Sequence, residues 1–266
     1  MSAWGGISVV NAIPSGLGSA IAIDMKTKIF IRRCSNFEKK PSSRLVEKIL
    51  EYFSSRYGLS NLCADVVSDI PMGSGLKSSS SVAVALIKAV KNLNIVEELD
   101  VPRLAAELSR LAGVSITGAL DDAAAAYYGG VVFTDNTNMK VIRVLDPKLE
   151  MSVVILIPRG VSRPPMNVDK LRKYSHLFEE VFSIAIQGDI FRAMTLNGLL
   201  IARLMGYSED VPRKALSMGA SAAGVSGNGP ATFAVCRAGD EGPIIEFFSR
   251  YGEVRVHRFV RVGETP

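Results

Sequence analysis

The chain has 266 residues, of which 48% are hydrophobic and 21% are charged. It is therefore long enough for a substantial buried core and too apolar for a disordered protein. The net charge of +5 is spread over basic runs of at most two residues that alternate with acids, which favours a mixed surface over a nucleic-acid-binding platform. Glycines and Pro14 interrupt the uncharged stretch 2–23, so we expect buried strands there and no membrane span.

Cysteine and histidine usage narrows the compartment and the metal chemistry. The three cysteines (Cys34, Cys63 and Cys236) lie far apart and form no CxxC pair, so we expect neither a disulfide framework nor a thiolate zinc site. The two histidines are too few for a multi-histidine metal centre. No basic residue precedes an apolar run at the start, so a signal peptide is not expected. These features predict a reduced, cytoplasmic protein.

Strand and helix patterns alternate along the first half of the chain. Runs rich in Ile, Val and Ala predict strands at residues 7–13, 19–25, 27–33, 64–67 and 131–134. Apolar residues three and four apart, such as Leu45, Ile49 and Phe53, indicate a helix. Such patterns predict helices at residues 41–57, 79–93, 102–111 and 121–128.

The second half repeats the mixture of strands and helices in a different order. We predict a strand at 152–157, an arginine-bearing loop at 158–165, helices over 169–206 with a break near Gly188, a short helix at 211–218, a glycine-rich turn at 224–229, a strand at 231–236, a helix at 243–251 and a strand at 253–262. This order resembles a ferredoxin-like α+β half. A boundary near Asp146 and Pro147 would divide the chain into residues 1–147 and 148–266.

A loop rich in glycine and serine precedes the apolar helix pattern at 79–93. It comprises Pro71, Met72, Gly73, Ser74, Gly75, Leu76, Lys77, Ser78, Ser79, Ser80 and Ser81. Glycines allow backbone amides to approach a ligand, and the first turn of a helix has free N–H groups and a positive dipole end that favour an anion. The loop therefore indicates a phosphate site, with a flexible loop and a helix-capping serine as the equally weighted alternative.

Two familiar nucleotide motifs are absent from the sequence. Leu76 separates Gly75 from Lys77, so the loop lacks the G-K-[ST] ending of a Walker A motif. No G-x-G-x-x-G sequence opens the first helix, which argues against a Rossmann dinucleotide site.

Two adjacent acids, Asp121 and Asp122, begin the alanine-rich helix pattern at 121–128. One carboxylate at such a place can orient a substrate hydroxyl or accept its proton. Acids in the first turn of a helix are also favoured by its dipole alone, and from the residues by themselves we favour that structural reading. Successive helix residues point about 100° apart, so we expect the two not to face one pocket equally.

A third stretch, residues 219–230, consists of small residues that allow a phosphate or another backbone to approach; a tight interdomain turn is the alternative.

Taken together and in this order, the three stretches resemble the motifs of the GHMP kinase superfamily, which includes galactokinase, homoserine kinase and mevalonate kinase. The sequences GLKSSS at 75–80, ITGALDDA at 116–123 and SGNGPA at 226–231 look most like the archaeal-type shikimate kinases. The resemblance implies a two-domain α+β fold, with an N-terminal half like domain 2 of ribosomal protein S5 and a ferredoxin-like C-terminal half.

The resemblance also implies roles for individual residues. The loop 71–81 would wrap the phosphates of ATP, Ser79 would be a magnesium ligand, and Asp121 would be the catalytic aspartate acting on the acceptor hydroxyl. Glu107 is the acid in the preceding helix that would add a second magnesium ligand. Lys77 replaces a glycine of the family motif, so that position would tolerate a side chain, with the ammonium either near phosphate or in solvent.

The function implied is ATP-dependent phosphorylation of the 3-hydroxyl of shikimate. The carboxylate of shikimate would suit a bidentate arginine, and Arg159 and Arg163 on the loop 158–165 are candidates, with surface solvation as the slightly favoured alternative. Other readings are a homoserine or mevalonate-type kinase, a non-catalytic nucleotide-binding sensor, and a nucleic-acid-binding protein.

Overall fold

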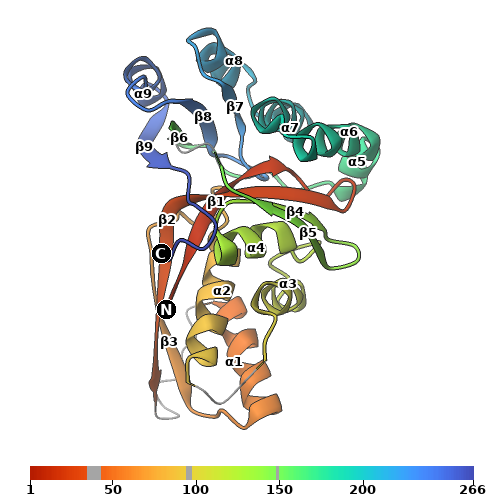
Figure 1. Ribbon diagram of the computed structural model, residues 1–266, viewed down its shortest axis with the longest axis vertical. Helices are drawn as coiled ribbons and strands as arrows, with labels where there is room; N and C mark the ends of the chain where they lie inside the picture. Colours follow the sequence, from red (N-terminus) through yellow and green to blue (C-terminus); the bar gives the residue numbers. More distant parts are fainter. Residues whose placement is uncertain (35–42, 94–97, 148–149) are drawn as a thin grey trace.

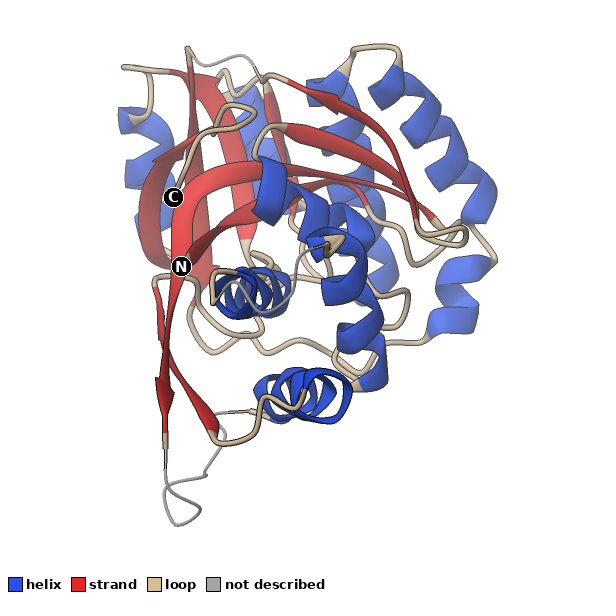
Figure 2. Ribbon diagram, turned by 60° about the horizontal axis from the view of Figure 1, so that its bottom comes forward, coloured by secondary structure: helices blue, strands red, loops and turns tan. Residues whose placement is uncertain are grey.

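The computed structural model describes residues 1–34, 43–93, 98–147 and 150–266, which form two antiparallel sheets flanked by helices (Figures 1 and 2). The first sheet contains β1 (Ser2–Val10), β2 (Leu17–Arg33), β3 (Leu62–Ser68), β4 (Val131–Asp135) and β5 (Lys140–Leu145). The long strand β2 pairs with β1 along one edge, and with β4 and then β3 along the other. This arrangement places the end of β1 beside the start of β2, where the candidate site lies.

Three helices pack against the first sheet, and a fourth packs on those helices (Figure 1). The three are α1 (Arg44–Tyr57), α2 (Ser78–Lys91) and α4 (Leu120–Tyr128), and the fourth is α3 (Val101–Leu111). Buried side chains such as Ile29, Phe53 and Leu86 fill the space between the helices and the sheet. The predicted helices are confirmed at 44–57, 78–91, 101–111 and 120–128; positions 41 and 42 lie outside the described residues.

The second sheet has the strand order β7-β8-β6-β9. Its strands are β6 (Met151–Pro158), β7 (Ala222–Val225), β8 (Thr232–Arg237) and β9 (Gly252–Arg258). Between β6 and β7 lie α5 (Val168–Arg172), α6 (Ser175–Ile186), α7 (Ile190–Met205) and α8 (Asp210–Ser217), and α9 (Gly242–Ser249) connects β8 to β9. The order of strands and helices is that of a ferredoxin-like βαββαβ unit, which confirms the prediction for this half.

One buried cluster joins the two sheets. It contains Ile7 and Ile21 of the first sheet, Val153 and Phe233 of the second, and Phe182 of α6. The predicted division at 147 and 148 stays a prediction, because this shared core crosses it and position 148 lies outside the described residues.

Three sequence predictions about strands were incomplete. Residues 19–25 and 27–33 form one continuous strand, because Lys26 does not end it. Lys26 is half-buried and pairs with Trp4 of β1, and the strand is paired before and after it as well. Strand β5 was missed because two of its six residues are charged, none is fully buried, and its polar and apolar residues do not alternate clearly. Strand β7 overlaps the predicted turn; its small residues allow α7 to approach, and a Cβ on Gly224 would lie 2.6 Å from the Cα of Gly198.

The expectation about cysteines was wrong. Cys34 and Cys63 form a disulfide with their Cα atoms 5.8 Å apart. The pairing of β2 with β3 brings together two residues 29 positions apart, which no count of cysteine spacings reveals. Intracellular proteins of hyperthermophiles also carry disulfides, so the bond leaves the cytoplasmic location a prediction.

None of the described helices is long and apolar enough to cross a bilayer.

We expect this disulfide to contribute about 3 to 4 kcal/mol to the free energy of unfolding, because a loop of 29 residues is closed in the unfolded chain. Reductant should lower the Tm of the protein and should leave unchanged the already lower Tm of the Cys34→Ser/Cys63→Ser double variant. Equal Tm values for the two proteins without reductant would contradict a stabilising bond.

Candidate active site

A single cleft collects the three sequence motifs. Its lining includes Gly75 and Ser79 of the glycine–serine loop, Asp121 at the start of α4, and Asn228 of the glycine-rich turn. Residues of β1 and of the segment before α4 complete the walls, including Ser8, Asn11, Ser115 and Thr117. Segments more than 150 positions apart in the sequence therefore meet at one place.

The glycine–serine loop has the backbone shape of an anion cradle. Gly73, Gly75 and Lys77 have positive φ angles of 73°, 90° and 70°. A Cβ on Gly75 would lie 2.2 Å from the carbonyl oxygen of Ser226, so glycine is required there by contact as well as by φ. The first-turn residues Ser78, Ser79 and Ser80 of α2 line the cleft, where their N–H groups have no acceptor one turn earlier in the helix.

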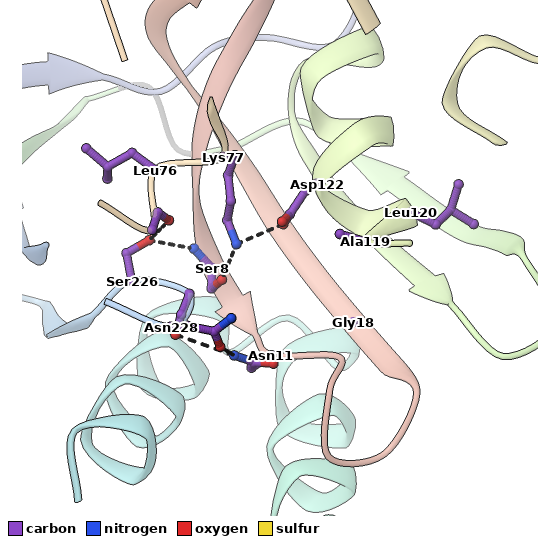
Figure 3. Close-up of polar contacts among 12 residues, drawn as sticks. Ser8, Asn11, Gly18, Leu76, Lys77, Ala119, Leu120, Asp122, Ser226 and Asn228 are labelled. Atoms are coloured by element: carbon purple, nitrogen blue, oxygen red, sulfur yellow. Dashed lines mark hydrogen bonds and ion pairs between the residues drawn. The ribbon is translucent and has the colours of Figure 1, made fainter. Parts of the chain in front are cut away.

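The loop is held in place by the glycine-rich turn. The hydroxyl of Ser226 donates to the carbonyl oxygen of Gly75 at 2.9 Å and accepts from the N–H of Ser8 at 3.3 Å (Figure 3). The N–H of Ala231 donates to the carbonyl oxygen of Ser74 at 2.9 Å. The small residues of the turn thus hold the loop in position. The sequence predicted that another backbone could approach these small residues, and that backbone is the glycine–serine loop.

The two helices that start at the cleft differ in charge. The first turn of α2 contains no acid, whereas the first turn of α4 contains Asp121 and Asp122. A helix N-terminus attracts an anion, and carboxylates repel one. The start of α2 is therefore the side of the cleft suited to phosphates, and the start of α4 is the side suited to a hydroxyl.

Asp121 is buried beneath β2, with 3% of its surface exposed. A Cβ on Gly18 would lie 2.8 Å from the Cγ of Asp121, so the glycine lets the strand pass directly over the carboxyl group. Burial, and secondarily the charge of Asp122, raises the pKa of Asp121 to about 7. Within the described residues its Oδ1 atom has no hydrogen-bond partner. This carboxyl group is thus tuned to exchange a proton near neutral pH.

Asp122 faces the same cleft and forms an ion pair. Its Oδ1 lies 2.8 Å from the Nζ of Lys77, whose side chain is 8% exposed (Figure 3). The Lys77 ammonium also donates to the hydroxyl of Ser8 at 2.5 Å. Both acids line the cleft, although the more buried Asp121 presents less surface to it, and Lys77 points inward rather than into solvent.

Comparisons with known proteins agree with this geometry. Residues 44–130 match the family described as GHMP kinases N terminal domain. A shikimate kinase of Pyrococcus abyssi is 36% identical over 93% of this chain and 94% of its own length. A shikimate kinase of Methanobrevibacter smithii is 34% identical over 93% of this chain and 91% of its own. The chain belongs to the GHMP kinase family. It is a small-molecule kinase.

Solved structures support the fold of this family. The mevalonate kinase of Methanococcus jannaschii superposes with a TM-score of 0.73 at 14% identity, covering 98% of both chains. The homoserine kinase of Cytophaga hutchinsonii gives a TM-score of 0.66 at 18% identity, covering 99% of this chain and 96% of its own. The predicted two-domain α+β fold of a GHMP kinase is thereby confirmed.

Not every residue of the predicted loop faces the cleft of this GHMP kinase. Leu76 is fully buried in the shared core, and Met72 is 90% exposed. The hydroxyl of Ser74 donates to Pro71 within the loop, and that of Ser81 donates to the carbonyl oxygen of Ala3. These four residues (Met72, Ser74, Leu76 and Ser81) do not line the cleft, and the other residues of the loop do.

The two predicted arginines lie in different places. Arg163 lines the cleft and donates to the carbonyl oxygens of Gly73 and Gly229 at 3.1 and 3.2 Å. It therefore bridges the glycine–serine loop and the glycine-rich turn. Arg159 is exposed and does not belong to the lining. Of the two, only Arg163 is placed to reach a bound substrate.

Glu107, the predicted second magnesium ligand, does not line the cleft. It lies on α3, and its carboxylate pairs with Arg103 of the same helix at 3.0 Å. Among the residues that the structure describes, no group of three or more His, Cys, Asp and Glu side chains is arranged to hold a metal ion.

Sequence reasoning assigned no role to Ser8 and Asn11. The amide of Asn11 donates to the side-chain oxygen of Asn228 at 2.9 Å (Figure 3). The backbone N–H of Asn11 donates to the side-chain oxygen of Asn197 at 2.8 Å. The signal was present, because both are polar residues in an otherwise uncharged, apolar N-terminal stretch. The two asparagine partners of Asn11 lie 186 and 217 positions away, and the partners Lys77 and Ser226 of Ser8 lie 69 and 218 positions away, so the contacts themselves could not be predicted.

Proposed function

We propose that the protein transfers the γ-phosphoryl group of ATP to the 3-hydroxyl of shikimate. The observation that carries the proposal is the similarity over nearly the whole chain to several proteins named shikimate kinase. The cleft supports it, because an anion cradle and a pair of acids lie on opposite helix N-termini of one site.

The nucleotide would lie with its phosphates along loop 71–81. The positive φ angles of Gly73 and Gly75 give the loop its concave shape. The free N–H groups in the first turn of α2 would donate hydrogen bonds to the phosphate oxygens. The acceptor hydroxyl would approach from the side of α4. Phosphoryl transfer is accelerated mainly by positioning and charge stabilisation, and this cleft offers both.

Magnesium suits the donor set of the cleft, which consists of serine hydroxyls and carboxylates, the hard oxygen ligands that this ion prefers. Ser79 in the first turn of α2 would hold it, together with phosphate oxygens and water. When bound, the ion supplies charge neutralisation at the phosphates. We do not assign Glu107 a role in this site.

The carboxyl group of Asp121 would accept the proton of the attacking hydroxyl. Its raised pKa lies near the pH at which such an enzyme works, and a general base is most effective there. Asp122, which pairs with Lys77, lies next to it in the first turn of α4.

Arg163 would bind the carboxylate of shikimate. We expect Arg163→Ala to raise the KM for shikimate about tenfold or more, since a charge-assisted hydrogen bond contributes about 1.5 to 3 kcal/mol. The KM for ATP should rise less than the KM for shikimate, although Arg163 also holds the loop through Gly73. Steady-state kinetics of Arg163→Ala and Arg159→Ala measure this, and a larger effect of Arg159→Ala would reverse the assignment.

The decisive experiment for the substrate is a coupled measurement of ADP release. Shikimate, homoserine and mevalonate are each supplied with ATP, with and without magnesium. We expect magnesium-dependent ADP release with shikimate alone. Release only with homoserine or mevalonate would identify another kinase of the family. ATP binding without turnover on any of the three would indicate a nucleotide-binding sensor.

A further inference from the structure

Lys77 combines an unfavourable backbone conformation with a buried charge. Its φ of 70° is in the left-handed region, where the backbone conformation of a residue with a Cβ is roughly 1 kcal/mol or more less stable than that of glycine. The side chain provides no cap for α2. Neither the turn nor the helix start therefore requires a lysine, and glycine would serve the backbone better.

The side chain reaches into the centre of the cleft. Its ammonium contacts Asp122 of α4 at 2.8 Å and Ser8 of β1 at 2.5 Å (Figure 3). The glycine-rich turn passes close by, because a Cβ on Gly227 would lie 3.3 Å from the Nζ of Lys77. Four segments that form the cleft thus converge on one cation.

The geometry of the ammonium leaves it a further donor. An ammonium has three N–H groups; Ser8 accepts a hydrogen bond from one of them, and Asp122 is an ion-pair partner at 2.8 Å. Ser78 and Ser79, the residues that follow Lys77, line the same cleft with their helix-start N–H groups. A phosphoryl group held by those N–H groups would lie beside the ammonium.

We infer that Lys77 is a catalytic residue whose ammonium, fixed between Asp122 and Ser8, donates to the phosphoryl group that is transferred. The inference rests on the proposed kinase activity and adds to it a cation that comes from the phosphate loop itself. Lys77 would then link the phosphate loop to the acid pair next to the reacting atoms.

The chemistry balances without any further reactant. The acceptor hydroxyl oxygen forms a bond to the γ-phosphorus, and the bond between that phosphorus and the β–γ bridging oxygen breaks. ADP leaves with the electron pair of that bond, and the hydroxyl proton passes to a carboxylate of the acid pair. The ammonium remains protonated and stabilises the charge on the γ-phosphoryl oxygens by hydrogen bonding.

A purely structural ion pair is the competing explanation, because Lys77 also neutralises a largely buried Asp122. Lys77→Gly distinguishes the two. Glycine suits a φ of 70°, so the variant keeps the backbone of the loop and removes only the side chain. Lys88→Met is the matched control: Lys88 is on the same helix and half buried, and it donates to the carbonyl oxygen of Ser2 away from the cleft.

The experiment measures kcat, Tm and the affinity for magnesium ATP of wild type and both variants. Wild-type turnover is established first, so that failure of the proposed function is recognised separately. We expect Lys77→Gly to lower kcat about 10²- to 10³-fold, as the loss of one donor to a developing charge does. Its ATP affinity should change less than tenfold, and Lys88→Met should keep its kcat.

Methylammonium or ethylammonium ions should raise the kcat of Lys77→Gly at least tenfold and should leave the kcat of the wild type unchanged. Lys77→Met should be as slow as Lys77→Gly but without rescue, because its side chain fills the space. Near-wild-type kcat of Lys77→Gly, or a slow variant that no amine rescues, would overturn the inference. Failure of the glycine variant to fold would also overturn it, in favour of the structural ion pair.

Discussion

Asp121→Asn is expected to lower kcat by about 10²- to 10⁴-fold, the usual contribution of a positioned general base. The amide keeps the size of the carboxyl group beneath Gly18 but cannot accept the proton of the acceptor hydroxyl. The affinity for ATP should change little, because the phosphates are held by α2 and the glycine–serine loop. Steady-state kinetics and calorimetric binding of ATP measure the two effects.

The pH dependence gives this prediction a second readout. Asp121 must be ionised to accept a proton, and its pKa is raised to about 7, so kcat/KM of the wild type should fall as the pH drops below about 7. Because the pKa in the folded state exceeds the ordinary value of 3.8, ionisation of Asp121 lowers the stability of the folded protein as the pH rises from about 4 to about 7. Asp121→Asn should therefore have a higher Tm than the wild type at pH 8.

Asp122→Asn is the matched control for Asp121→Asn. It removes the neighbouring carboxylate and the anchor of Lys77, and leaves Asp121 in place. A larger loss of kcat in Asp122→Asn than in Asp121→Asn would move the proton-accepting role to Asp122. Near-wild-type kcat in both variants would contradict base catalysis by this pair.

Gly75→Ala should disrupt the nucleotide site. The added Cβ would lie 2.2 Å from the carbonyl oxygen of Ser226, and φ at this position is 90°. The loop must move away from the glycine-rich turn, which displaces the start of α2. We expect the KM for ATP to rise about 100-fold or more and the Tm to fall by several degrees, as measured by kinetics and thermal unfolding.

Gly73→Ala is the matched control for this contact. Gly73 has a similar φ of 73°, but a Cβ there meets nothing within 4 Å. Its cost should be limited to backbone strain, about 1 kcal/mol of stability. If the two alanine variants behave alike, backbone strain alone explains both, and the contact between loop and turn is not what holds the site.

The elements that the sequence predicted well are those governed by local patterns. Helix α1 follows from the spacing of its apolar residues and from the capping of its first turn by Ser43. The glycine–serine loop was predictable because positive φ angles and close contacts leave a strong preference for glycine. Strand β5 and the disulfide depend on pairing across the sheet, which local patterns do not encode.

The site was predictable in its motifs but not in its contacts. The sequence gives no indication that Lys77 reaches Asp122, 45 positions later, or that Ser226 holds the carbonyl group of Gly75. Arg159 and Arg163 lie on the same loop, and the sequence does not show which of them faces the cleft. The path of the loop after β6 brings Arg163 to the cleft and leaves Arg159 outside it. Long-range geometry decides which of several suitable side chains belongs to the site.

Hydrogen exchange of the full-length protein, with and without a non-hydrolysable ATP analogue and magnesium, tests the location of the nucleotide most directly. We expect slower exchange of the backbone amides at 73–80 when the analogue is bound, with smaller effects at 226–229. Protection confined to segments outside the cleft, with residues 73–80 exchanging as fast as in the free protein, would contradict it.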